Sequence, residues 1–237
     1  MTRRMSEDSE ENWNGVRLPQ RANDEFPYRY LKFDEVDSTF FPEGKDLPPE
    51  SLCWILMSKG KGKRPQLSKR ARIVEPCEDG ERFLVRYPKG STYRVRRNMV
   101  LPVLEHEEKL IIVAPETSDY RRMAIVQTRP EDHFIEIGCD YGILPDSVDA
   151  KSSLGIDKSE ESISIANERY PKGNYLLADI FDPEFELKVE QPLVVAIDIN
   201  GNRALPAVID CLQLVLDKMS PRVVVVKSRE MYSQLTR

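Results

Sequence analysis

The sequence lacks long apolar runs, paired cysteines and an apolar leader. No hydrophobic segment approaches the length of a membrane span, and the two arginines near the amino terminus are not followed by the apolar region of a secretory signal. The four cysteines include no C-x-x-C pair and no neighbouring histidine, which argues against a zinc site and against a disulfide framework. These absences predict a protein without a metal or a membrane contact, located inside the cell in the cytoplasm or the nucleus.

Charge is distributed unevenly along the 237 residues, although the net charge is only -5. Residues 1–50 contain seven Lys or Arg and twelve Asp or Glu, whereas residues 58–98 contain thirteen and four. Such a basic segment favours an acidic partner, with nucleic acid as the first candidate, although solvated basic faces are also common without one. The candidate contacts are Lys59, Lys61, Lys63, Arg64, Lys69 and Arg70.

Three segments follow one another along the chain. Residues 1–50 are acidic and without sustained periodicity, so we expect them to be mostly irregular. Residues 51–104 contain five short strand-like runs separated by polar turns such as "CEDG" and "PKGS", which is typical of a small all-β barrel. This basic module resembles SH3-like and Tudor-like barrels in pattern, and Trp54, Tyr87 and Tyr93 could stack on bases or form a cage for a methylated side chain.

Residues 109–237 alternate strands with helical patterns. The nearly continuous apolar runs "LVVAI" and "VVVV" are typical of strands buried on both faces, and the alternation predicts an α/β domain with a mostly parallel sheet. Ligands of such sheets bind outside the carboxyl ends of the strands. In "FIEIGCDYG", Gly138 and Gly142 stand directly after a predicted strand, but their spacing does not match the dinucleotide fingerprint G-x-G-x-x-G.

The segment "EIGCDYG" resembles motif I of the class I S-adenosylmethionine-dependent methyltransferases, which have a Rossmann-like sheet, with Asp140 in place of the middle glycine. The resemblance covers residues 119 to about 229. It implies S-adenosylmethionine as the cofactor, an acidic residue that bonds the ribose hydroxyls (Asp157) and an acidic residue near the adenine (Asp179). The implied cofactor-binding residues are Glu136, Gly138, Cys139, Asp140, Gly142, Asp157, Lys158, Asp179 and Ile180.

Plainer explanations remain open for these residues. The two glycines could form an ordinary strand-to-helix turn, and Asp157 could help to start the helix predicted from "DKSEES", with Ser159 as its cap. Asp179 could only cap a turn, and Cys139 fits a small loop residue better than a nucleophile.

Two features depart from the family pattern. Pro145 falls inside the helix expected after motif I, so that helix should be short, displaced or distorted. The sheet also looks truncated after its fifth strand, where the family continues with a helix and an antiparallel hairpin, unless another element covers that edge.

The acceptor site of this fold usually lies at the end of the fourth strand, which makes Asp198 and Asn200 candidate catalytic residues, although Asp198 could equally cap a turn. Together with Lys227, Asp198 resembles two members of the Lys-Asp-Lys-Glu set of 2′-O-ribose RNA methyltransferases. The resemblance therefore implies a methyltransferase that acts on a macromolecular acceptor, RNA or protein. The alternative is a non-catalytic methyltransferase-fold protein with a Tudor-like reader or an RNA-binding module.

Overall fold

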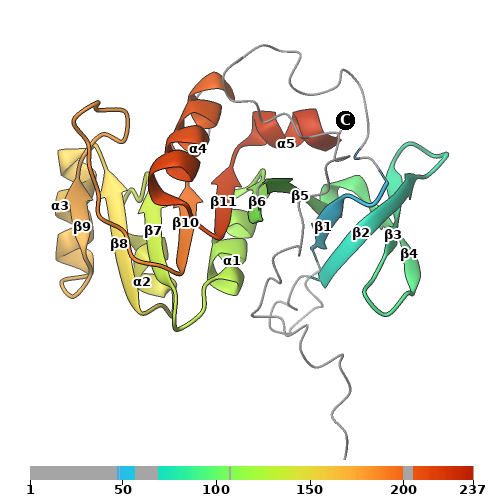
Figure 1. Ribbon diagram of the computed structural model, residues 1–237, viewed down its shortest axis with the longest axis horizontal. Helices are drawn as coiled ribbons and strands as arrows, with labels where there is room; N and C mark the ends of the chain where they lie inside the picture. The colour runs from blue at the N-terminus through green and yellow to red at the C-terminus, as the bar shows by residue number, and fades with distance from the viewer. Residues whose placement is uncertain (1–46, 48, 57–68, 107, 200–204, 237) are drawn as a thin grey trace, which may run out of the picture.

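The computed structural model describes residues 47, 49–56, 69–106, 108–199 and 205–236. Within these residues the strands form one continuous sheet with the order β4-β3-β2-β1-β5-β6-β11-β10-β7-β8-β9 (Figure 1). Six neighbouring strands of this sheet are parallel and the other five are antiparallel. No helix in the described ranges is long and apolar enough to cross a membrane.

The parallel part of the sheet confirms the prediction of an α/β architecture. Its strands, in spatial order, are β6 (Lys109–Ala114), β11 (Val223–Lys227), β10 (Leu193–Ile197), β7 (His133–Ile137), β8 (Ser152–Asp157) and β9 (Tyr175–Leu177). Every residue of β7 and β10 is buried, as the apolar runs predict for central parallel strands.

Helices cover both faces of the parallel strands. Because side chains alternate along a strand, Val195 and Val224 pack with α4 (Leu205–Met219) and α5 (Arg229–Thr236), whereas Val194 and Val225 pack with α1 (Thr117–Gln127) and α2 (Ile143–Ser147). The fifth helix, α3 (Glu160–Arg169), contacts β8 and β9. The helix after motif I is short, with only five residues and Pro145 inside it, as expected.

The sheet continues past β11, at the edge where truncation was expected. The neighbouring position is occupied by β6, which runs parallel to β11 with Val225 opposite Ile112. β6 comes from before motif I in the chain, and it pairs in turn with the antiparallel strand β5 (Val100–His106). An upstream strand therefore covers the backbone hydrogen-bonding groups of that edge.

All five strands expected between residues 51 and 104 are present. They are β1 (Leu52–Ile55), β2 (Lys69–Pro76), β3 (Arg82–Arg86), β4 (Thr92–Arg96) and β5, with a short 3-10 helix, η3 (Arg97–Met99), before β5. β2, β3 and β4 form an antiparallel meander, and β1 lies between β2 and β5. The closure of these strands into an SH3-like or Tudor-like barrel stays a prediction.

α5 connects the two parts of the molecule. The Tyr232 hydroxyl donates to the carbonyl oxygens of Arg97, over 3.1 Å, and of Val100, over 3.0 Å. In turn, Nη1 of Arg97 donates to the carbonyl oxygen of Thr236 over 3.2 Å. α5 begins only two residues after Lys227, the last residue of β11. Its hydrogen bonds to Arg97 and Val100 therefore link the end of β11 to η3 and β5.

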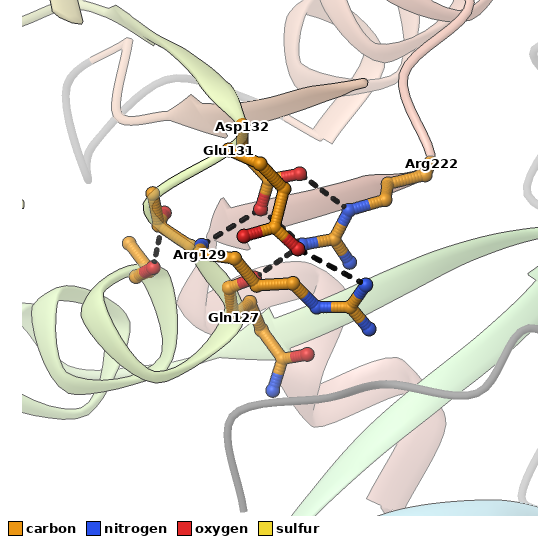
Figure 2. A network of polar contacts seen from close by, with 7 residues as sticks. Gln127, Arg129, Glu131, Asp132 and Arg222 are labelled. Atoms are coloured by element: carbon orange, nitrogen blue, oxygen red, sulfur yellow. Dashed lines mark hydrogen bonds and ion pairs between the residues drawn. The ribbon is translucent and has the colours of Figure 1, made fainter. Parts of the chain in front are cut away.

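A buried ion pair holds the opposite, amino-terminal ends of the central strands (Figure 2). Asp132, which is fully buried, accepts hydrogen bonds from Nε and Nη2 of Arg222 and from the backbone N–H of Arg129. Arg222 also donates to the carbonyl of Gln127 over 2.6 Å. Asp132 directly precedes β7 and Arg222 directly precedes β11, so the network ties both strands to the end of α1. It lies at the end of the strands opposite to their carboxyl ends.

Candidate functional site

A pocket of about 380 Å³ lies at the carboxyl ends of β7, β8, β9 and β10. This is the place predicted for a ligand of an open parallel sheet, and the volume falls within the roughly 300–1,000 Å³ of small-molecule sites. Eight predicted residues line the pocket: Gly138, Asp140, Asp157, Lys158, Asp179, Ile180, Asp198 and Lys227. The fold therefore brings together residues that are almost ninety positions apart in the sequence.

Gly138 shapes the floor of the pocket. Its φ of +79° lies in the left-handed region, and a Cβ at this position would lie only 2.1 Å from the carbonyl oxygen of Asp198. The N–H groups of Gly138 and Cys139 both donate to the carbonyl of Ile156, over 2.8 and 3.1 Å. Glycine is therefore required for the close approach of this loop to the end of β10.

The Asp157 carboxylate is held at the end of β8 by two backbone amides. Oδ2 accepts from the N–H of Asp140 over 3.0 Å, and Oδ1 accepts from the N–H of Ser159 over 2.9 Å. Ser159 caps α3 as expected, accepting from the N–H of Ser162 over 3.2 Å. Asp157 thus helps to start the helix and also presents its carboxylate to the pocket, so the two interpretations of this residue are compatible.

Asp179 and Lys158 form the more exposed rim of the pocket. Oδ1 of Asp179 accepts from the N–H of Phe181 over 3.1 Å, which is the turn-capping contact expected from the sequence. Its other oxygen lies 3.7 Å from Nζ of Lys158. Ile180 is buried and also lines the pocket, so an apolar surface lies beside the Asp179 carboxylate.

Asp198 and Lys227 form an ion pair inside the pocket. Nζ of Lys227 lies 3.1 Å from Oδ1 and 2.9 Å from Oδ2 of Asp198, and both side chains are largely buried. The pair joins the carboxyl ends of two adjacent strands, β10 and β11. Asn200, the third predicted catalytic residue, lies outside the described residues.

Three predicted cofactor residues do not line the pocket. Cys139 is buried with its thiol toward Gly155, and burial raises the pKa of this thiol, which argues against a thiolate nucleophile. Gly142 has a φ of +76°, and a Cβ there would lie 2.7 Å from the ring of Tyr175, so this glycine is required by packing.

Glu136, the third of these residues, is buried behind the pocket. Its Oε1 accepts from the Tyr120 hydroxyl over 2.9 Å, and no described group is bonded to Oε2. Burial raises the pKa of Glu136 to about 8, the Tyr120 hydrogen bond opposes that rise, and the nearby charge of Asp198 adds to it. Glu136 is therefore mostly protonated at neutral pH, and its hydrogen bond is to Tyr120 on α1 rather than to a group that lines the pocket.

The described lining of the pocket is acidic. It includes four aspartates, Asp140, Asp157, Asp179 and Asp198, against two lysines, which leaves a formal charge of −2. This charge is unsuited to a pyrophosphate, which is itself doubly negative, and it suits a ligand with a positive centre. Sequence reasoning did not identify seven further lining residues, although each lies within a few positions of a predicted one: Ile137, Ile156, Ser159, Ser162, Ala178, Phe181 and Ile199.

The structure places only part of the predicted basic contact surface. Lys59, Lys61, Lys63 and Arg64 lie outside the described residues, whereas Lys69 and Arg70 begin β2. Of the three candidate aromatic residues, Trp54 is a core residue with 3% exposure, and the ring of Tyr87 has Nζ of Lys69 at 5.9 Å from its centroid. Tyr93 is 67% exposed.

Comparison with known proteins gives limited similarity. The chain matches no protein-family model and no curated protein sequence. Among solved structures it is similar to the plantazolicin methyltransferase BpumL in complex with a triazolic desmethylPZN analog and SAH, at 24% identity and a TM-score of 0.30 over 42% of this chain and 38% of that one. It is also similar to the same enzyme with a monoazolic analog and SAH, at 19% identity and a TM-score of 0.32 over 50% and 48%.

The chain thus spans less than half the length of the methyltransferase structures that it matches. A TM-score near 0.3 is too low to establish a common fold.

Proposed function

We propose that the chain binds S-adenosylmethionine in the pocket at the carboxyl ends of β7 to β10 and is a methyltransferase for a macromolecular acceptor, RNA or protein. The observation that carries the proposal is the negatively charged lining around the Gly138 turn. Three strands that follow one another along the chain, β8, β9 and β10, each have a carboxylate at or just after their carboxyl end: Asp157, Asp179 and Asp198. S-adenosylmethionine carries a sulfonium and an ammonium group, so this charge favours it over a dinucleotide.

The residues present fit the parts of such a cofactor. Both oxygens of Asp157 are already oriented by backbone N–H groups, and each keeps a lone pair that can accept from a ribose hydroxyl. Ile180 supplies an apolar surface for an adenine ring, with Asp179 and Lys158 at the rim. The glycine turn leaves the backbone of residue 138 open to the pocket without a side chain.

The bound cofactor would supply an electrophilic methyl group, and the protein needs chiefly to align an acceptor and exclude water. We propose Lys227 and Asp198 for this task, because they line the same pocket and hold each other in one orientation. The Lys227 ammonium can donate to an acceptor oxygen or to a phosphate beside it. The Asp198 carboxylate can accept a proton or a hydrogen bond from an acceptor hydroxyl or amine.

A non-catalytic binding protein is the second candidate. It is favoured by Asp140, which stands at the middle glycine position of motif I and has a φ of +47°, a conformation that is uncommon for a residue other than glycine. In either case, we propose that residues 51–104 form an SH3-like or Tudor-like module that contacts the macromolecular partner. The strand order β4-β3-β2-β1-β5, with a 3-10 helix before β5, supports this proposal.

Titration calorimetry of the full chain with S-adenosylhomocysteine tests the cofactor assignment. Asp157→Ala should weaken binding by about 1.5–3 kcal/mol, because charge-assisted hydrogen bonds are lost. Asp210→Ala is the matched control, since Asp210 is an exposed aspartate on α4 away from the pocket lining. If the unmodified chain does not bind, or if Asp157→Ala binds equally well, the assignment is wrong.

Methyl transfer from labelled S-adenosylmethionine into the RNA and protein fractions of a cell extract separates the two candidates. Label in one fraction, lost in Lys227→Met, supports the enzyme and identifies its acceptor class. Binding of the cofactor without transfer to either fraction supports the non-catalytic protein.

A further inference from the structure

Three glycines surround the side chain of Tyr175, the first residue of β9. A Cβ on Gly142 would lie 2.7 Å from this side chain, and a Cβ on Gly155, on β8, would lie 2.8 Å from it. At the opposite edge of the ring, a Cβ on Gly173 would lie 2.5 Å from Cε2. Carbon atoms that are not bonded are ordinarily separated by about 3.5 Å or more. The tyrosine ring therefore occupies a slot that only glycine backbone leaves open.

Backbone conformation explains only one of these glycines. Gly142 has a φ of +76°, which glycine adopts without strain. Gly155 and Gly173 have no positive φ, and a glycine inside a strand, as Gly155 is, often marks the close approach of another group. That group includes Sγ of Cys139 as well as Tyr175 at Gly155, whereas the three atoms nearest to a Cβ on Gly173 all belong to Tyr175. The tyrosine side chain thus accounts for glycines that a positive φ does not explain.

The Tyr175 hydroxyl holds one end of the turn formed by residues 139–142. It donates to the carbonyl oxygen of Gly142 over 3.2 Å. The same carbonyl accepts the first hydrogen bond of α2, from the N–H of Asp146, over a long 3.3 Å. Because α2 has only five residues, it gives this carbonyl little support of its own. The tyrosine supplies the second contact.

The other end of the same turn reaches the pocket. The turn is closed by the N–H of Gly142, which donates to the carbonyl of Cys139 over 2.9 Å. Within it, Asp140 has a φ of +47°, a conformation that persists only where the surrounding contacts fix it. The Asp140 N–H donates to Oδ2 of Asp157 over 3.0 Å, and Asp157 lines the pocket. One tight turn therefore joins the Tyr175 hydroxyl to a carboxylate of the pocket.

We propose that Tyr175 is a positioning residue of the pocket, which acts by holding the 139–142 turn in place. The turn keeps the Asp140 N–H on Asp157, whose carboxylate then faces the ligand. This inference rests on the proposed function, in which Asp157 accepts hydrogen bonds from the ribose hydroxyls of S-adenosylmethionine. A carboxylate that is oriented before binding loses less freedom when the ligand binds, so a looser turn should weaken binding without removing any group that contacts the ligand.

Core packing alone is the simpler role for a tyrosine ring in such a slot. Packing would affect the stability of the protein, but it would not connect the hydroxyl to Asp157. Tyr175→Phe separates the two roles, because it keeps the ring and removes only the hydroxyl. Tyr232→Phe is the matched control, since the Tyr232 hydroxyl also donates to backbone carbonyls, and Tyr232 lies on α5 outside the described pocket lining.

Amide hydrogen exchange of the full chain without ligand tests the hold on the turn. In Tyr175→Phe, exchange at the Asp140 N–H should be faster by roughly fivefold, because one hydrogen bond that opposes local opening is lost. Exchange at Ile135, on the buried strand β7, should stay unchanged. Gly173→Ala should also speed exchange at Asp140, because its new Cβ would displace the Tyr175 side chain. Equal exchange at Asp140 in Tyr175→Phe and the unmodified chain would overturn the proposal.

Titration calorimetry with S-adenosylhomocysteine tests the effect on the pocket. Tyr175→Phe should lower the affinity by roughly two- to tenfold. The same substitution in the Asp157→Asn background should have no further effect, because the hydroxyl acts through Asp157. Thermal melts followed by circular dichroism establish that the variants fold.

Two outcomes of the titrations would make Tyr175 a packing residue and overturn the proposal. They are additive losses for the Tyr175 and Asp157 substitutions, and an equal loss of affinity in Tyr232→Phe. Absence of binding to the unmodified chain would instead overturn the proposed function. The exchange measurement needs no ligand, so it would still decide whether Tyr175 holds the turn.

Discussion

Replacing Glu136 by glutamine should change how the stability of the protein depends on pH. Glu136 lies on β7 with only 4% exposure, and the Tyr120 hydroxyl is bonded to one of its two carboxyl oxygens. Burial raises the pKa of Glu136 from 4.5 to about 8. A glutamine has nearly the same shape, can still accept from Tyr120 through its carbonyl oxygen, and cannot ionise.

The sign and the size of the effect follow from proton linkage. The folded protein holds the Glu136 proton more tightly than the unfolded chain does, so the resulting stability is fully present below pH 4.5 and is lost as the pH rises through about 8. The rise of the pKa from 4.5 to about 8 corresponds to a change of about 4–5 kcal/mol in the free energy of unfolding, because each pKa unit is worth about 1.4 kcal/mol. The Gln variant loses this dependence and should be more stable than the unmodified protein at alkaline pH.

Urea unfolding followed by circular dichroism between about pH 5 and pH 9 measures this difference. The unmodified protein should lose several kcal/mol more than Glu136→Gln over that range. Glu186→Gln serves as the control, because Glu186 is exposed and should leave the profile unchanged. Parallel profiles for Glu136→Gln and the unmodified protein would refute the reasoning, since they would mean that Glu136 is ionised in the folded state.

Two further substitutions test how the site and the strand ends are built. Gly138→Ala should destabilise the protein by more than about 2 kcal/mol in urea unfolding, because the new Cβ would lie 2.1 Å from the Asp198 carbonyl oxygen; a loss under about 0.5 kcal/mol would contradict the observed turn. Asp132→Ala should cost about 3–5 kcal/mol, because it leaves the largely buried Arg222 without its carboxylate partner (Figure 2). A thermal melt unchanged from that of the unmodified protein would mean that the ion pair contributes little.

The elements themselves could be predicted because their signals are local. Apolar runs of five residues bounded by polar turns predicted the central strands, and "DKSEES" predicted the start of α3 at the Ser159 cap. The positions of Gly138, Asp157 and Asp179 after successive strands followed from the same signals. Since parallel strands of one sheet end at the same edge, these residues were expected to meet there, and they line one pocket.

The partners of these side chains could not be predicted, because they depend on which strands become neighbours. Nothing local in "KLIIVA" indicates that β6 pairs with β11 and covers the edge at which the sheet was expected to end. The sequence placed Lys227 with Asp198 only through a partial resemblance to a catalytic set, and the order of strands brings the two into contact across 29 positions of sequence. A lysine at a strand end is ordinarily solvated, and only the pairing of β10 with β11 places it inside the pocket.

The amino-acid sequence by itself determined the order of strands and helices, the short helix at Pro145 and the acidic residues at the strand ends, because periodicity, turn residues and helix caps act over a few residues. The tertiary structure alone decided which carboxylates face the pocket. Asp157 and Asp179 point into it, whereas Glu136, from the same motif as Gly138, is turned toward Tyr120 and buried. That distinction depends on packing between β7 and α1, and the free energy of burying a carboxyl group depends on neighbours that are distant in the sequence.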